Sequence, residues 1–244
     1  MKTLVYQVNI GHGTQWGISD LTLNFINKVC IPSVFNYAKK NNYDYKIFDQ
    51  DIFYNYGENF LNSEGTALSF NKYLYAGYGD YDQYIYIDTD IYIFDNAEKL
   101  PQVKTFCAVS EPEGVETHDI FRNYYSLDNQ FKYINSGFLT FNLNTAKFIH
   151  KYFSNRIKEQ RKGKVKNTDN GILNEFLYID NENFKFEILE EKWNFMPHLK
   201  KHIDNTKPNF IHFVGGDGKD YIRDLNKQTD DIKIFLEDVF WNNN

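Results

Sequence analysis

Hydrophobic and polar residues alternate along this chain with two different periods. Runs rich in β-branched and aromatic residues predict strands, and they fall at residues 3–10, 45–48, 84–94, 106–109 and 209–213. Apolar residues at helical spacing predict helices over residues 21–40, 68–78, 145–162, 168–177 and 230–241. Strands that alternate with helices predict an α/β fold with a mostly parallel central sheet flanked by helices. The chain has no internal repeat and no linker-like segment, so we expect a single domain.

Three sequence features affect individual elements of this predicted pattern. Pro32 predicts a break or kink in the helix over residues 21–40. The Asn-Ser-Gly triplet at residues 135–137 has the composition of a turn and precedes a buried strand. Thr168 and Asp169 have the character of a cap for the helix that follows them.

Two carboxylates, Asp88 and Asp90, interrupt the hydrophobic run over residues 84–94. Successive side chains of a strand point to opposite faces, so we expect these two to point to the same side. Two unpaired carboxylates are costly to bury, so they require a cation or a wet strand end. The same spacing recurs in two segments that read as turns, Asp49/Asp51 and Asp80/Asp82.

Polar residues lie at the ends of three predicted strands, where open α/β sheets bind their ligands. The three segments are Asp88/Asp90, the triplet at 135–137, and residues 212–219, which end in Gly-Gly-Asp-Gly-Lys. Carboxylates favour Mg²⁺ or Mn²⁺, and the imidazole of His212 shifts the preference toward Mn²⁺. Such a metal, with Lys219 beside it, would neutralise the charge that develops on a departing diphosphate.

Composition narrows the class of protein. The chain has 244 residues with 42% hydrophobic content, as expected for one large globular domain. A formal net charge of −6 argues against nucleic-acid binding. The sequence contains no run of about 18 apolar residues, so we expect no transmembrane helix. The first residues lack a signal-peptide pattern. Cys30 and Cys107 have apolar flanks, so we expect buried free thiols and a cytoplasmic protein.

A group of basic residues lies at and just beyond the end of the helix predicted over residues 145–162. We expect a solvated helix end, and the alternative is a surface for a polyanionic acceptor or a membrane. The group comprises Arg156, Lys158, Arg161, Lys162, Lys164 and Lys166.

Five segments, taken in order, resemble the GT-A-fold nucleotide-sugar glycosyltransferases, in particular glycosyltransferase family 8, the family of glycogenin and the lipopolysaccharide galactosyltransferases. The family's Asp-x-Asp motif at a strand end is matched by Ile87-Asp88-Thr89-Asp90, and its basic residue in the preceding helix by Lys72. The other three matches are Asn135-Ser136-Gly137-Phe138-Leu139, Asp169-Asn170-Gly171-Ile172-Leu173-Asn174, and Phe210-Ile211-His212-Phe213-Val214-Gly215 with Lys219.

The resemblance implies a GT-A (Rossmann-like) fold over residues 1–222. The hydrophobic pattern predicts that residues 223–244 form a C-terminal helix that packs on the same domain, with an oligomer contact as the alternative. The resemblance also implies roles for individual residues. Asp88, Asp90 and His212 would bind Mn²⁺ or Mg²⁺, and Asp169 and Asn170 would be catalytic residues beside the transferred sugar. The donor would be bound by Val8, Asn9, Lys72, Asp88, Thr89, Asn135, Ser136, Gly137, Gly215 and Lys219.

The chain departs from the family pattern at three places. Asn170 stands where the family has Gln, which makes the side chain one methylene shorter. The end motif has one extra residue, so Lys219 follows Gly215 by four positions, and Asp220-Tyr221 replaces Pro-Trp. The segment before Asn135 lacks an acidic residue that is common in glycogenin-like members.

The resemblance predicts a metal-dependent glycosyltransferase that moves a sugar from a nucleoside-diphosphate sugar, UDP-linked, to an acceptor hydroxyl with retention of configuration. The acceptor would be a glycan, a protein or a lipid-linked molecule. One alternative is a sugar-nucleotide nucleotidyltransferase, against which the loop at residues 11–14 counts, because it has no Arg or Lys. The other alternative is a non-catalytic sugar-nucleotide or glycan-binding module.

Overall fold

The computed structural model describes residues 1–10, 19–53, 68–159, 161–165, 168–181, 183–199, 207–228 and 231–242. The loop at residues 11–14 lies outside these ranges, as does Lys166.

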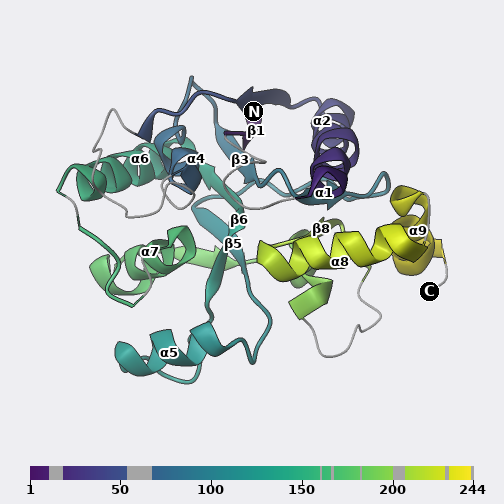
Figure 1. Cartoon of the computed structure of the whole chain (residues 1–244). Helices are drawn as coiled ribbons and strands as arrows, with labels where there is room; N and C mark the ends of the chain where they lie inside the picture. The colour runs from purple at the N-terminus through teal and green to yellow at the C-terminus, as the bar shows by residue number, and fades with distance from the viewer. Residues whose placement is uncertain are drawn as a thin grey trace.

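A six-stranded sheet forms the centre of the molecule (Figure 1). All of its neighbouring strands are parallel except β6, which is antiparallel to both of its neighbours, so the predicted mostly parallel sheet is confirmed. In spatial order the strands are β2 (Asp44–Phe48), β1 (Thr3–Val8), β3 (Gln83–Ile87), β6 (Ile134–Asn142), β5 (Phe106–Ser110) and β7 (Phe186–Ile188).

The hydrophobic run over residues 84–94 is not one strand. β3 ends at Ile87, and a separate strand, β4 (Ile91–Ile93), pairs antiparallel with β8 (Phe210–His212) in a two-stranded sheet. The segment between them is a turn in which the Ile91 N–H donates to the Asp88 carbonyl over 3.2 Å. The prediction of one continuous strand was therefore wrong, because the chain turns where the two carboxylates leave the paired backbone.

The triplet at residues 135–137 is also different from the prediction. It lies inside β6, where Ile134 pairs with Ser110 of β5 and Phe138 pairs with Ile87 of β3. A turn composition did not produce a turn here because the small side chains of the triplet fit a strand that is covered on both edges.

Helices cover both faces of the sheet. In the view of Figure 1, α4, α6 and α7 lie on one side of the strands, and α1, α2, α8 and α9 lie on the other. Alternate residues of β3 point to these two sides: Tyr84 and Tyr86 join the cluster of α4, α6 and α7, whereas Ile85 and Ile87 pack against α2. The helices are α1 (Asp20–Phe25), α2 (Ile31–Lys40), α4 (Asn71–Leu74), α5 (Glu116–Tyr124), α6 (Leu143–Lys158), α7 (Asp169–Glu175), α8 (Gly215–Gln228) and α9 (Ile232–Glu237).

Pro32 does not break the helix over residues 21–40. A π-helical turn (Ile26–Cys30) connects α1 to α2, and Pro32 occupies the first turn of α2. A proline is tolerated there because its missing N–H interrupts little of the regular bonding. Further π-helical turns follow α7 (Phe176–Asp180) and α9 (Asp238–Asn242), and short 3₁₀ helices lie at Glu191–Trp193 and Pro197–Leu199.

The C-terminal elements form a third hydrophobic cluster with the small sheet. Leu236 and Phe240, in and just after α9, pack in the cluster that contains Tyr92 and Phe94, and the predicted domain boundary at residue 222 falls inside α8. Both cysteines are buried and free, as predicted. Within the described part of the chain, no helix is long and apolar enough to span a bilayer.

Candidate functional site

A cavity of about 490 Å³ opens at the carboxyl ends of β1 and β3, between the large sheet, β8, α7 and the start of α8. It brings together every predicted site residue except Asn9. The Asn9 backbone N–H donates instead to the Phe48 carbonyl over 2.8 Å. The predicted residues in the cavity wall are Val8, Lys72, Asp88, Thr89, Asp90, Asn135, Ser136, Gly137, Asp169, Asn170, His212, Gly215 and Lys219.

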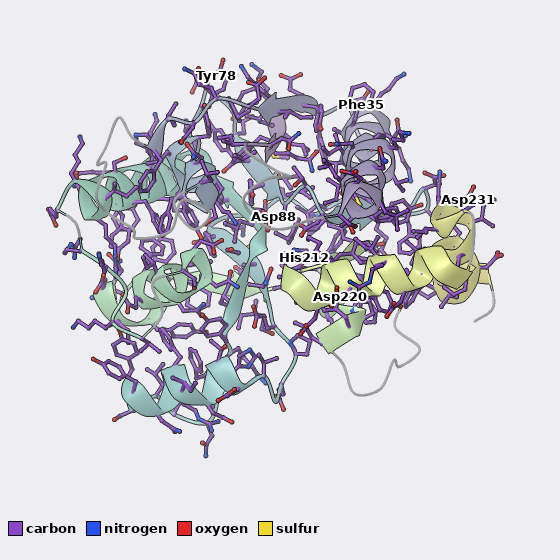
Figure 2. The ribbon with its side chains drawn as sticks, viewed as in Figure 1. Phe35, Tyr78, Asp88, His212, Asp220 and Asp231 are labelled. Carbon is purple, nitrogen blue, oxygen red and sulfur yellow. The ribbon has the colours of Figure 1, made fainter. Side chains whose placement is uncertain are left out.

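Asp88, Asp90 and His212 converge in this cavity, with one ligand atom of each within 4.8 Å of the others. Figure 2 shows Asp88 and His212 near the centre of the molecule. The pairing of β4 with β8 explains the convergence, because His212 lies opposite Ile91, directly beside Asp90. The Nε2 atom of His212 lies 3.3 Å from Asp90 Oδ1 and 3.8 Å from Asp88 Oδ2.

The chemistry of this cluster fits a divalent cation. Lysines hold the other oxygen of each carboxylate: Lys72 lies 3.4 Å from Asp88 Oδ1, and Lys219 contacts Asp90 Oδ2. His212 is buried, and neither of its ring nitrogens makes a hydrogen bond to any described residue. Two carboxylate oxygens and an orphaned imidazole nitrogen therefore face one point, and such a buried polar group requires a partner.

Gly137 makes room for this cluster. A Cβ atom added at residue 137 would lie 2.2 Å from His212 Cε1 and 2.9 Å from Asp88 Oδ2. These separations are shorter than any van der Waals contact, so only glycine allows the imidazole and the carboxylate to approach β6.

Lys72 connects the metal cluster to Asp169. Its Nζ atom lies 2.9 Å from Asp169 Oδ2 and 3.1 Å from Ser136 Oγ, in addition to its contact with Asp88. Burial lowers the pKa of Lys72, but Asp169 and Asp88 outweigh that effect and raise it above its usual value. Burial likewise opposes ionisation of Asp169, yet the Lys72 ammonium lowers the pKa of this carboxyl. The pair is therefore ionised at neutral pH.

Lys219 reaches the cavity from a helix and not from a loop. The glycine-rich segment begins α8, and its Gly218 backbone packs so closely on Phe213 that a Cβ would lie 2.2 Å from the Phe213 carbonyl carbon. The Lys219 ammonium donates to the Phe213 carbonyl over 2.7 Å and to Asp90. Burial opposes the charge of Asp90, but Lys219 and His212 hold the pKa of this carboxyl well below its usual range.

Asp169 is not the N-cap of α7. The Thr168 hydroxyl caps the helix by accepting from the Gly171 N–H over 3.1 Å. Asp169 is thereby available to accept from Lys72 and, over 2.7 Å, from the Ser136 hydroxyl. The neighbouring Asn170 directs its amide oxygen at the Ser136 N–H over 2.9 Å.

Tyr86 and Glu111 also line the cavity and bind predicted site residues, although the sequence did not indicate them as site residues. The Tyr86 hydroxyl donates to Asp88 Oδ1, and the Glu111 carboxylate accepts from the amides of both Asn135 and Asn170. A signal existed for each: Tyr86 lies two residues before Asp88, and Glu111 lies two residues after the predicted strand at 106–109. Glu111 also supplies an acidic group beside Asn135, which the segment before Asn135 lacks.

The other two Asp-x-Asp pairs, Asp49/Asp51 and Asp80/Asp82, lie outside the cavity, and one residue of each makes hydrogen bonds there. Asp51 Oδ1 accepts from the Phe53 N–H and from the Asn71 side chain, and Asp82 accepts from the Lys2 N–H. None of the four residues lines the cavity.

The basic group at the end of α6 is only partly exposed to solvent. Arg156 is buried, in contrast to the prediction, and pairs with the equally buried Glu175 and with Asp180. Lys158, Arg161, Lys162 and Lys164 are exposed as expected.

Comparisons with known proteins agree with the family resemblance found in the sequence. A model of glycosyl transferase family 8 matches residues 27–219, and no curated protein sequence matches. A glycosyltransferase involved in glycosylation of the major capsid of PBCV-1 is similar in structure, with a TM-score of 0.55, 9% identity, and 91% of this chain and 100% of that chain covered. Galactosyltransferase LgtC, solved with donor and acceptor sugar analogs, has a TM-score of 0.51, 15% identity, and coverage of 92% and 95%.

A third similar structure, the bifunctional glycosyltransferase WbbM, has a TM-score of 0.53 and 15% identity, and the match covers 94% of this chain but 52% of WbbM. Identities this low establish a shared fold and nothing finer. The fold is that of the GT-A glycosyltransferases, as the sequence resemblance implied.

Proposed function

The chain belongs to glycosyl transferase family 8, and we propose that this glycosyltransferase moves a sugar from a UDP-linked donor to an acceptor hydroxyl, with retention of configuration and with Mn²⁺ or Mg²⁺ bound by Asp88, Asp90 and His212. The observation that carries the proposal is that the two oxygens of each aspartate have different partners. One oxygen of each aspartate contacts a lysine, and the other faces the imidazole of His212, whose nitrogens make no hydrogen bond within the described part of the chain.

The diphosphate of the donor would bind beside Lys219 and the start of α8. When bound, the metal ion would supply Lewis-acid stabilisation of the charge on the departing diphosphate. Lys219 adds a cation, and the free backbone N–H groups of the first turn of α8 favour an anion. Gly215 and Gly216, which also line the cavity, leave room for a close approach of phosphate to the backbone.

Lys72, Asp169 and Asn170 would position the transferred sugar. Asp169 Oδ2 already accepts from Lys72 and Ser136, and the amide oxygen of Asn170 accepts from the Ser136 backbone. The Lys72 ammonium and the Ser136 hydroxyl both bind Asp169 Oδ2, which makes that oxygen a weaker nucleophile. We therefore propose a front-face route, in which the leaving phosphate deprotonates the acceptor hydroxyl and Asp169 acts by charge and orientation.

The setting of the reaction is part of the proposal. Two buried free thiols suit a reducing compartment, which supports a cytoplasmic enzyme. The acceptor hydroxyl would belong to a glycan, a protein or a lipid-linked molecule. Transfer of a nucleotidyl group and mere binding of a glycan, the two alternatives from the sequence, have no comparable support in the family assignment.

An Asp90→Asn variant tests the metal site. We expect it to lose Mn²⁺-dependent binding of UDP and at least about 100-fold of the rate of UDP-galactose or UDP-glucose hydrolysis, because one ligand and the charge partner of Lys219 are lost together. Calorimetry and a UDP-release assay measure the two effects. Asp80→Asn, from an exposed look-alike pair, is the matched control and should behave as the wild type. Hydrolysis that stays dependent on Mn²⁺ and undiminished in Asp90→Asn would refute the site.

A further inference from the structure

The Glu111 carboxylate, at the end of β5, connects three side chains on the sugar-binding side of the cavity. Its Oε1 atom accepts from Asn135 Nδ2 over 3.1 Å and from Asn170 Nδ2 over 3.0 Å. Its Oε2 atom lies 3.2 Å from His118 Nε2. Only 9% of the Glu111 side chain is exposed, so these protein groups replace most of the water that would otherwise solvate the carboxylate.

The two amides held by Glu111 have fixed orientations. The Asn135 amide oxygen accepts from the Gly137 N–H, and the Asn170 amide oxygen accepts from the Ser136 N–H, both over 2.9 Å. Each amide is thus fixed at its oxygen by β6 and at its nitrogen by Glu111. A rotation of either amide by 180° would bring its oxygen against the Glu111 carboxylate, where neither group can donate.

His118 holds the opposite side of Glu111. It comes from the first turns of α5, and its ring stacks on Tyr133 with centroids 5.2 Å apart and an interplanar angle of 21°. An ionised carboxylate can only accept, so the Nε2 atom of His118 carries the proton toward Glu111. The stacking and the hydrogen bond together fix the rotamer of Glu111 from the side opposite the two amides.

We propose that His118 is a positioning residue of the transferase, which acts through Glu111 to hold the amides of Asn135 and Asn170 in the orientation that receives the transferred sugar. This inference rests on the proposed function, because it needs Asn135 and Asn170 beside that sugar. His118 itself would touch neither donor nor acceptor.

Substitution of His118 separates positioning from general stability. His118→Leu removes the donor but keeps an apolar group against Tyr133, whereas His118→Gln keeps a donor that can reach the carboxylate. Ile120→Ala is the matched control, since Ile120 is an exposed residue of the same helix, 45% accessible. The measurements are steady-state hydrolysis of UDP-galactose and UDP-glucose with Mn²⁺, and the affinity of Mn²⁺–UDP by calorimetry.

We expect His118→Leu to lower kcat by roughly 10- to 100-fold, the size of effect seen when a reacting group is displaced by about 1 Å. The KM for the sugar nucleotide and the affinity for UDP should change less than about twofold, because the diphosphate half of the cavity is untouched. His118→Gln should recover most of kcat, and Ile120→Ala should match the wild type.

Two results would overturn the inference. One is an unchanged kcat in His118→Leu, and the other is a parallel loss of kcat and UDP affinity in His118→Leu and His118→Gln, which marks general damage. A wild type that binds and hydrolyses no sugar nucleotide would instead defeat the proposed function. In that case a crystal structure of His118→Leu still decides the contact: an intact 3.0 Å bond between Asn170 and Glu111 means that His118 positions nothing.

Discussion

At the scale of single residues, the most consequential side chain is Lys72. It is 3% exposed and lies between two carboxylates, Asp88 and Asp169, that are each less than a third exposed. Removal of one partner from a buried charge cluster destabilises the protein by more than the net stabilisation that the intact cluster provides. The reason is that the remaining buried charges are left without a partner. Lys72 is therefore expected to matter for folding as well as for the donor.

Lys72→Met should lower the free energy of unfolding by about 3 kcal/mol at pH 7. The loss should shrink as the pH falls below about 4. The sign follows from Asp169: its folded pKa lies below its usual value, so the ion pair stabilises the fold above the unfolded pKa and this contribution disappears as the pH falls through the folded pKa. Without the lysine, protonation of the carboxylates relieves their repulsion.

Urea unfolding of Lys72→Met and the wild type at pH 7 and at about pH 3 measures this difference. Lys39→Met, at an exposed position of α2, serves as the control and should change stability by less than about 0.5 kcal/mol at either pH. A deficit for Lys72→Met that is equal at both pH values would contradict the electrostatic explanation.

Much of the candidate site could be predicted at this scale, but not which atoms contact one another. Residue type and position at a strand end indicated Asp88, Asp90 and His212, and Lys72 was indicated by its charge within the family pattern. Glu111 was missed because it stands outside every motif, and its role comes from contacts with residues 24 and 59 positions away. Likewise, no sequence pattern says which oxygen of Asp90 belongs to Lys219.

At the scale of elements, the coupling of α6 to α7 depends on a buried ion pair. Arg156 on α6 contacts Glu175 on α7, and each side chain is 4% exposed. The same guanidinium donates to the carbonyls of Arg161 and Lys162, and Glu175 accepts from the Lys164 N–H. The segment that leads to Asp169 is therefore tied to the helix that carries Asp169.

Arg156→Met should destabilise the protein by about 3 kcal/mol, since it leaves Glu175 buried without its cation. The double variant Arg156→Met/Glu175→Leu should recover most of that loss, because it removes both charges. Urea unfolding measures the two changes. Arg161→Met, at a 47% exposed position, is the control with an expected change below about 0.5 kcal/mol; an equal loss in all three variants would refute the ion-pair account.

The elements that could be predicted are those that bury a regular face. β1, β2, β5, β8 and α6 have periodic patterns, and they were found within a few residues. α5 and β7 were missed for a physical reason: among the residues of α5 only Phe121 is buried, and β7 is a three-residue strand at the sheet edge with two exposed positions. Such elements are held by contacts with distant parts of the chain, as β7 is by its pairing with β5.

At the scale of the whole molecule, the candidate site lies where two sheets meet. Asp88 follows a strand of the large sheet, whereas Asp90 and His212 belong to the small one with its helices α8 and α9. A ligand that bridges these residues should stabilise the entire fold, because it adds contacts between the two sheets.

Mn²⁺ and UDP together should therefore raise the melting temperature more than the sum of their separate effects. At concentrations about 100-fold above Kd, binding contributes about 2.7 kcal/mol, which corresponds to roughly 5–10 °C for a domain of this size. Differential scanning calorimetry with each ligand alone and with both measures this. Asp90→Asn should abolish the excess, and purely additive shifts in the wild type would argue against a shared site.

The tight fit of Gly137 against His212 has a consequence for the evolution of this family. The two positions occupy one volume, so their substitutions cannot be independent: a relative with alanine at the position of Gly137 has no space for an imidazole at the position of His212. We expect such a relative to carry a smaller side chain in place of the histidine and so to lack the nitrogen ligand. The two positions should therefore vary together among relatives, which an alignment of the family would test.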